Sequence, residues 1–245
     1  MQWTDEGVVL SVRSHGETGA ILEALTREHG RHLGLVHGGA SRKVKAALQP
    51  GNALHLSWRG RLSEHLGSYD TEPLRLRAGT MLEQRASLAG LNAFTAIASA
   101  VLPEREPHRA VFEAAELLLG AIAEDGFAHW GPLYVRWEAG LLEELGFGLD
   151  LARCAATGVT DDLIYVSPRS GRAVSREAGA PYRERLLALP SFLLGSQNAS
   201  PSGAEIGAGL RLTAHFLLER VLQPHGKDLP AARLRLEELA SRESE

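Results

Sequence analysis

The chain changes from strand-like to helix-like patterning near residue 77, and this switch limits the folds that it can adopt. Before the switch, short apolar or alternating segments are separated by turn signals. These segments cover residues 7–13, 20–25, 31–37, 53–59 and 66–76. The pattern of the second segment fits a strand or a helix, and Pro73 weakens the last one as a strand. Five short strands in so short a stretch predict a small β-barrel or sandwich.

After the switch, apolar residues recur at three- and four-residue steps, which predicts helices. The periodic segments cover residues 78–102, 107–125, 132–146, 205–222 and 230–239. Pro103 stops the first helix, Pro132 opens the third, and Gly146 suits the position just after its end. We expect the last five residues to be frayed.

Two segments between the helices break the helical pattern. Residues 163–175 predict two short strands around the turn Ser-Pro-Arg-Ser-Gly, and residues 196–203 predict a polar loop. The strands would form a small hairpin insert at about residues 152–182.

Positive charge is concentrated in the strand-rich part of the chain. The net charge of the whole chain is −4, but between residues 27 and 61 seven cations face the single anion Glu28. The densest group follows paired glycines in LVHGGASRKVKAALQPG, residues 35–51. Glycine backbones allow close approach to a ligand, and Arg or Lys side chains donate hydrogen bonds to phosphates. This asymmetry favours a local polyanion site.

Two features of this region leave alternatives open. The cationic stretch could bind nucleic acid, or it could be a solvated turn between two strands. Trp58 could stack on a base, but it shares a strand face with Leu54 and Leu56, which favours a core position.

The sequence lacks the common catalytic signatures. It contains no G-x-S-x-G, H-E-x-x-H or S-x-x-K, and Gly226-Lys227 and Gly207-Ala208-Gly209 lack the rest of a nucleotide-binding fingerprint. His15, His29, His32 and His37 have no companion carboxylate or cysteine in metal-ligand spacing. Cys154 is the only cysteine, which excludes an intrachain disulfide and a four-cysteine zinc ribbon around the insert.

Two stretches carry a resemblance to a known family. Residues 26–51, TREHGRHLGLVHGGASRKVKAALQPG, and residues 136–158, RWEAGLLEELGFGLDLARCAATG, resemble the RecO family of bacterial DNA repair proteins, and the resemblance extends over nearly the whole chain. It implies an N-terminal OB-fold and a helical C-terminal domain. It also implies binding of single- and double-stranded DNA, annealing of complementary strands and loading of the recombinase, without an enzymatic reaction.

The same resemblance implies partners and one departure from the family pattern. Such proteins work with a RecR-type protein, often with a RecF-type protein, and contact the C-terminal tail of the single-strand-binding protein. Many relatives hold zinc with four cysteines, but Thr157, Ser175 and Ala178 stand at three of those positions here. We therefore expect no metal or other cofactor.

From these observations we expect an α+β protein. An OB-fold DNA-binding domain would span residues 1–78, and a helical domain with the hairpin knuckle would span residues 79–245. The expected DNA contacts are the cations of the basic region, Arg27, Arg31, Arg42, Lys43, Lys45, Arg59 and Arg61. The N-terminus lacks a positively charged signal-peptide region, which predicts a cytoplasmic protein, associated with the nucleoid during repair.

Two other functions stay open. The chain could be an interaction adaptor whose helical domain, with cations such as Arg136, docks acidic-hydrophobic tails, with DNA binding secondary. It could also be a hydrolase without a recognisable signature.

Overall fold

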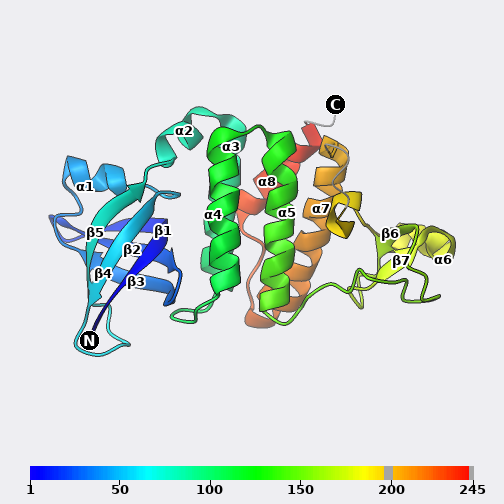
Figure 1. Ribbon diagram of the computed structural model, residues 1–245, viewed down its shortest axis with the longest axis horizontal. Coiled ribbons are helices and arrows are strands. Elements are labelled where there is room, and N and C mark those ends of the chain that lie inside the picture. The colour runs from blue at the N-terminus through cyan, green and yellow to red at the C-terminus, as the bar shows by residue number, and fades with distance from the viewer. Residues whose placement is uncertain (196–200, 243–245) are drawn as a thin grey trace. The chain divides into compact units, whose positions relative to one another are not determined.

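The computed structural model describes residues 1–195 and 201–242, which form two compact units, Met1–Glu124 and Asp125–Glu245 (Figure 1). The boundary predicted near residue 78 follows the change from strands to helices. The first unit continues beyond that point and includes the next helices, up to Glu124.

The first unit contains a closed five-stranded barrel, as the sequence predicts (Figure 1). Its strands are β1 (Gln2–His15), β2 (Gly19–Thr26), β3 (Gly30–Val36), β4 (Ala53–Arg59) and β5 (Ser68–Arg75). They follow the order β1-β2-β3-β5-β4, and β1 also pairs with β4. β3 and β5 run parallel, whereas the other neighbouring strands are antiparallel. This is the connectivity of an OB-fold, so the expected fold is confirmed.

Period-two alternation explains the barrel core. Leu22 and Ala24 of β2 and Leu54, Leu56 and Trp58 of β4 are buried in one cluster, because alternate residues of a strand face the same side. Trp58 is only 1% exposed, and its indole N–H donates to the carbonyl of Leu66 at 3.0 Å. The core position favoured for Trp58 is therefore confirmed.

The cationic stretch forms a helix, where the sequence pattern favoured a turn between two strands. Helix α1 (Arg42–Ala47) joins β3 to β4. Val44, Ala47 and Leu48 pack against the barrel core. This three- and four-residue spacing places apolar groups on one helical side. The remaining residues of the turn face solvent, and they include the exposed Arg42, Lys43 and Lys45.

Three helices complete the first unit: α2 (Ala78–Glu83), α3 (Arg85–Val101) and α4 (Arg109–Glu124). The single helix expected over residues 78–102 is wrong, since Gln84 adopts an extended backbone (φ −115°, ψ 125°) between α2 and α3. Leu102, which precedes Pro103, is also extended, so the stop expected at this proline is confirmed.

The second unit is built on α5 (Phe127–Glu144), α7 (Gly203–Phe216) and α8 (Ala231–Arg242). Pro132 lies inside α5, so the prediction that it opens this helix is wrong; Gly126 precedes the first helical residue. At the other end Gly146 has φ +84°, and Phe147 N–H donates to Leu142 O at 2.7 Å, which confirms the predicted glycine cap.

The segment predicted as a helix over residues 205–222 changes its winding near the end. After α7, residues Leu217–Leu222 form the π-helical turn η3, and Gln223–His225 form the 3₁₀ turn η4. Ser202 and Glu205 form a capping box at the start of α7.

The insert has one strand more than the hairpin that we expected. β6 (Leu163–Val166) pairs with β7 (Ala173–Ser175) and also with β8 (Leu187–Ala188). The short helices α6 (Arg176–Gly179), η1 (Ala180–Arg185) and η2 (Ser191–Leu194) complete it. Residues 196–200 of the predicted polar loop and residues 243–245 of the predicted frayed end lie outside the described residues, whereas residues 241 and 242 belong to α8.

Within residues 1–195 and 201–242, no helix combines the length and the apolar character needed to cross a bilayer.

Candidate nucleic-acid interface

One cross-strand row on the barrel wall places two arginines on either side of an apolar centre. Arg13 of β1 pairs with Ile21 of β2, Ile21 pairs with Leu35 of β3, and Leu35 pairs with Ser68 of β5. Ser68 in turn pairs with Arg59 of β4. Neighbouring strands lie ~4.8 Å apart, so the row follows the wall for roughly 19 Å. We call these five residues the cationic row.

The side chains of the cationic row point out of the barrel. Arg13 and Arg59 are exposed, and Ile21, Leu35 and Ser68 are half-buried, whereas the next residues Val36, Trp58 and Tyr69 are buried in the core. OB-folds bind oligonucleotides on the face of their second and third strands and on the loops beside it. The centre of the row lies on this face.

Helix α1 begins beside the same face. Gly39 N–H donates to Val36 O at the end of β3, and Ala40 N–H donates to Thr18 O in the turn between β1 and β2, at 3.0 Å. Gly38 has φ +68°, which suits glycine and lets the chain turn sharply into the helix. The cations of α1 are thus fixed near the end of β3, next to the β1–β2 turn.

The exposed cations in this part of the barrel have no intramolecular counter-ion. Among the described residues, no carboxylate lies within ion-pair distance of Arg13, Arg42, Lys43, Lys45, Arg59 or Arg61. Arg61 lies on the loop between β4 and β5, which Arg105 holds by donating to Glu64 O at 2.9 Å. Their charges are available to an external polyanion.

Arg27 and Arg31, also expected to contact DNA, are used within the protein. Arg27 pairs with Glu6 at 3.2 Å and lies over the ring of Phe112. Arg31 pairs with Glu23 at 2.7 Å and donates to Leu102 O at 2.8 Å. The carboxylates of Glu6 and Glu23 compensate the charges of the two arginines.

Arg13 is not among the residues expected to contact DNA, because it lies outside the window between residues 27 and 61. The signal was present in the alternation of β1, where Ser11, Arg13 and His15 fall on one face and are all exposed.

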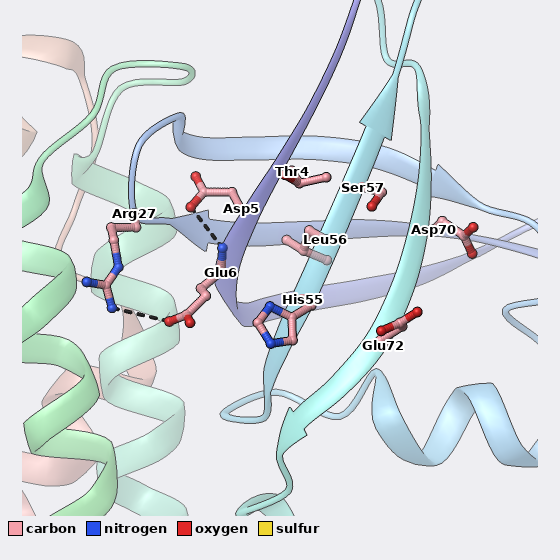
Figure 2. Close-up of a pocket in the computed structure, with 9 residues that line it drawn as sticks. All are labelled: Thr4, Asp5, Glu6, Arg27, His55, Leu56, Ser57, Asp70 and Glu72. Atoms are coloured by element: carbon pink, nitrogen blue, oxygen red, sulfur yellow. Dashed lines mark hydrogen bonds and ion pairs between the residues drawn. The ribbon is translucent and has the colours of Figure 1, made fainter.

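The barrel wall next to the Arg59–Ser68 end of the cationic row is acidic and surrounds a hollow of about 580 Å³. Figure 2 shows Glu6, His55 and Glu72 on three adjacent strands, where they form one cross-strand row. Thr4, Ser57 and Asp70 form the next row. The acidic side chains of this hollow repel phosphates, so the charge distribution of the barrel favours the side of the cationic row beside α1 as the nucleic-acid face.

The knuckle of the second unit does not fit a zinc ion. Cys154 is buried, and its sulfur accepts hydrogen bonds from the backbone N–H and the hydroxyl of Ser175, at 3.3 and 3.5 Å. Burial raises the pKa of Cys154, but hydrogen bonds from Ser175 and Thr157 outweigh this effect and lower the pKa to about 6. One thiol with hydroxyl neighbours is not a closed tetrahedral zinc set.

Arg136, the cation considered for docking a peptide tail, also has an internal role. Its guanidinium donates to the carbonyl of Phe192, with the closer nitrogen at 2.8 Å.

Comparison with known proteins identifies the family. The family model described as "Recombination protein O N terminal" matches residues 1–77, and "Recombination protein O C terminal" matches residues 82–229. The chain belongs to the RecO family. The expected resemblance is therefore confirmed over both parts of the chain.

Several curated relatives of the RecO family align with almost the full length of the chain. A DNA repair protein RecO from Cereibacter sphaeroides is 52% identical over 244 residues, which cover 99% of each chain. The protein of the same name from Rhodospirillum rubrum is 50% identical and covers 97% of this chain and 96% of its own length. The one from Phenylobacterium zucineum is 51% identical, with 96% and 95% covered. A role in DNA repair follows from this family membership.

Proposed function

We propose that the chain is a DNA-binding recombination mediator that binds single- and double-stranded DNA and anneals complementary strands. The observation that carries this proposal is the group of exposed, uncompensated cations on the wall of an OB-fold barrel and on the helix beside it. The group consists of Arg13 and Arg59 in the cationic row, the three cations of α1, and Arg61. Arg27 and Arg31 are left out of the proposed contact set, because carboxylates of the same chain compensate them.

Such a surface is sufficient for annealing. Two complementary strands repel each other through their phosphates, and cations that neutralise the phosphates lower this barrier. Contacts to the backbone read no sequence, so they suit strands of any sequence and leave the bases free to pair. The proposed function needs no nucleophile, general base or cofactor.

The direct test is an annealing assay with two complementary, fluorophore-labelled oligonucleotides. The variant Arg42→Ala/Lys43→Ala/Lys45→Ala should anneal them more slowly than the wild type at moderate salt. The matched control is Arg153→Ala/Arg183→Ala/Arg185→Ala, which removes three exposed cations from the knuckle without touching the barrel. Equal annealing rates for wild type and the α1 variant would refute the site assignment.

We also propose the partners that the family implies. The chain would act with a RecR-type protein, and in some settings with a RecF-type protein, to load the recombinase onto DNA covered by single-strand-binding protein. It would contact the C-terminal tail of that protein and work in the cytoplasm, at the nucleoid during repair. Family membership supports these partners, and a binding assay with each purified partner tests them one at a time.

One observation supports the adaptor function as a second candidate. A hollow of about 730 Å³ in the first unit is lined by Leu76 and Leu117, which are 61% and 75% exposed, with Arg27, Arg75 and Arg77 beside them. Exposed leucines among arginines suit an acidic-hydrophobic peptide. However, Arg75 and Arg77 both pair with Glu116, so the charge of the hollow is largely balanced. Peptide binding without any affinity for bare DNA would favour this candidate.

A further inference from the structure

Three aromatic rings form a column at one end of the barrel. The ring of Trp3 lies parallel to that of His29, with centroids 4.0 Å apart and planes at 8°. Trp3 is also stacked with Trp58, with centroids 5.7 Å apart and planes at 15°. Offset parallel rings at these distances attract one another, so the column is a stable arrangement.

The column leads from the core to the surface. Trp58 is 1% exposed, Trp3 is half-buried, and the side chain of His29 is 33% exposed. The imidazole of His29 is therefore the outer end of the stack, on the turn between β2 and β3.

The outer ring is held in place before any ligand arrives. Its Nδ1 lies 2.9 Å from the carboxylate of Asp5. The same carboxylate accepts the backbone N–H groups of Glu6 and Glu28, both at 2.8 Å. Asp5, which also lines the acidic hollow, is thus satisfied by three donors, and the orientation of the imidazole is fixed. A ring that is already ordered loses little conformational entropy when a partner stacks on it.

The middle ring is also rigid. Trp3 meets His32 and Tyr69 edge-to-face, at 5.1 and 5.8 Å between centroids. The hydroxyl of Tyr69 lies 3.0 Å from Nδ1 of His32, and both residues are buried. Four aromatic neighbours therefore hold Trp3, and the column keeps its direction.

The inner ring of the column, Trp58, precedes Arg59, which forms one end of the cationic row. Trp3 pairs with Trp58 across β1 and β4, and the next pair in the same ladder is Gln2 with Arg59. Trp58 faces the core and Arg59 faces outward, so a strand whose phosphate binds Arg59 passes the end of the barrel at which the outer ring of the column is exposed. Every base has a π-face, so stacking on an aromatic ring accepts any sequence.

We propose that the imidazole of His29 is a stacking platform for one unpaired nucleobase of a bound single strand. This proposal rests on the proposed DNA-binding function and adds a contact to a base to the expected contacts with phosphates. It predicts that this position binds single strands better than duplexes, because the bases of a duplex are already stacked and paired.

The test compares two oligonucleotides of equal length and charge, one with normal bases and one with abasic sugars throughout, in a fluorescence anisotropy titration. His29→Gln keeps a donor for Asp5 but removes the ring. It should bind the base-bearing strand about tenfold more weakly and the abasic strand as tightly as the wild type does. His29→Phe restores a flat ring and should bind the base-bearing strand within about twofold of the wild type.

The control variant is His225→Ala, which removes an exposed histidine from η4 of the second unit and should change neither affinity. A second readout uses a strand with 2-aminopurine, whose fluorescence should be quenched by wild type and less by His29→Gln. Unchanged affinity of His29→Gln for the base-bearing strand, or an equal loss for both strands, would overturn the platform and leave the proposed function standing. Failure of the wild type to bind either strand would refute the proposed function itself.

Discussion

Arg233 of α8 and Glu138 of α5 form an ion pair in which both side chains are completely buried. The guanidinium donates to the two carboxylate oxygens at 2.6 and 2.9 Å and to Leu210 O at 2.6 Å. Thr213 of α7 donates its hydroxyl to the same carboxylate at 2.5 Å. One ion pair thus joins the three long helices of the second unit.

Removing one partner of this pair leaves a buried charge without compensation. Arg233→Met should therefore lower the free energy of unfolding by ~3–5 kcal/mol, measured by urea denaturation. The double variant Glu138→Leu/Arg233→Met should lose much less than the sum of the two single variants, because neither charge remains. Additive losses in this cycle would show that the pair is not the source of the effect.

His32 should make the stability of the barrel depend on pH. Burial, with a contribution from Arg105, lowers the pKa of His32 from 6.5 to about 4. Between these values the unfolded chain takes up a proton and the folded chain does not, so stability is full above pH 6.5 and falls toward pH 4. The loss should be ~2–3 kcal/mol greater for wild type than for His32→Gln, since each pKa unit corresponds to ~1.4 kcal/mol. Parallel pH profiles of the two proteins would contradict this assignment.

Cys154 should also make the folded state more stable as the pH rises, but over a higher pH range than His32. Its pKa is lowered from 9.0 to about 6, because hydrogen bonds from Ser175 and Thr157 outweigh the effect of burial. The folded thiolate therefore adds stability that is complete above pH 9 and lost as the pH falls to 6. Wild type should gain more stability than Cys154→Ala between pH 6 and pH 9, in urea denaturation under reducing conditions. Ser175→Ala should reduce the gain, and an unchanged gain in that variant would exclude the hydrogen bonds as its cause.

Arg31 separates stability from DNA binding. Arg31→Ala removes the ion pair with Glu23 and the hydrogen bond to Leu102, and should cost ~1–3 kcal/mol of unfolding free energy. Under conditions in which both proteins are fully folded, the DNA affinity of Arg31→Ala should stay within about twofold of the wild type. The reason is that Glu23 already compensates the charge of Arg31. A large loss of DNA affinity in a fully folded variant would return Arg31 to the contact set.

The strands and most helices could be predicted because each depends on a local pattern. The segment 53–59 alternates apolar and polar residues, and β4 covers the same residues. The prediction of secondary structure failed where contacts with residues distant in sequence determine the local structure, as in α1. Val44, Ala47 and Leu48 form a buried helical face only because they pack against the barrel core. Six residues with three cations otherwise look like a solvated turn.

The candidate site could be predicted only in part, because charge density is visible in the sequence but contacts between distant residues are not. Charge density indicated the cations of α1, but it could not show that Arg31 binds Glu23 and Leu102, which are 8 and 71 residues away in the sequence. It also missed Arg13, which joins the row only through strand pairing with Ile21. The stack of Trp3 on His29 depends on two segments that meet only in the closed barrel.

The most direct test of the central claim is the salt dependence of binding to a labelled single strand, measured by anisotropy for wild type and Arg42→Ala/Lys43→Ala/Lys45→Ala. Each lost phosphate contact reduces the slope of log K against log salt by about 0.7 for single strands. Three lost contacts predict a slope shallower by about two units, with an unchanged slope for the knuckle control Arg153→Ala/Arg183→Ala/Arg185→Ala. If the α1 variant keeps the wild-type slope, the helix does not contact DNA and the cations of α1 are only solvated.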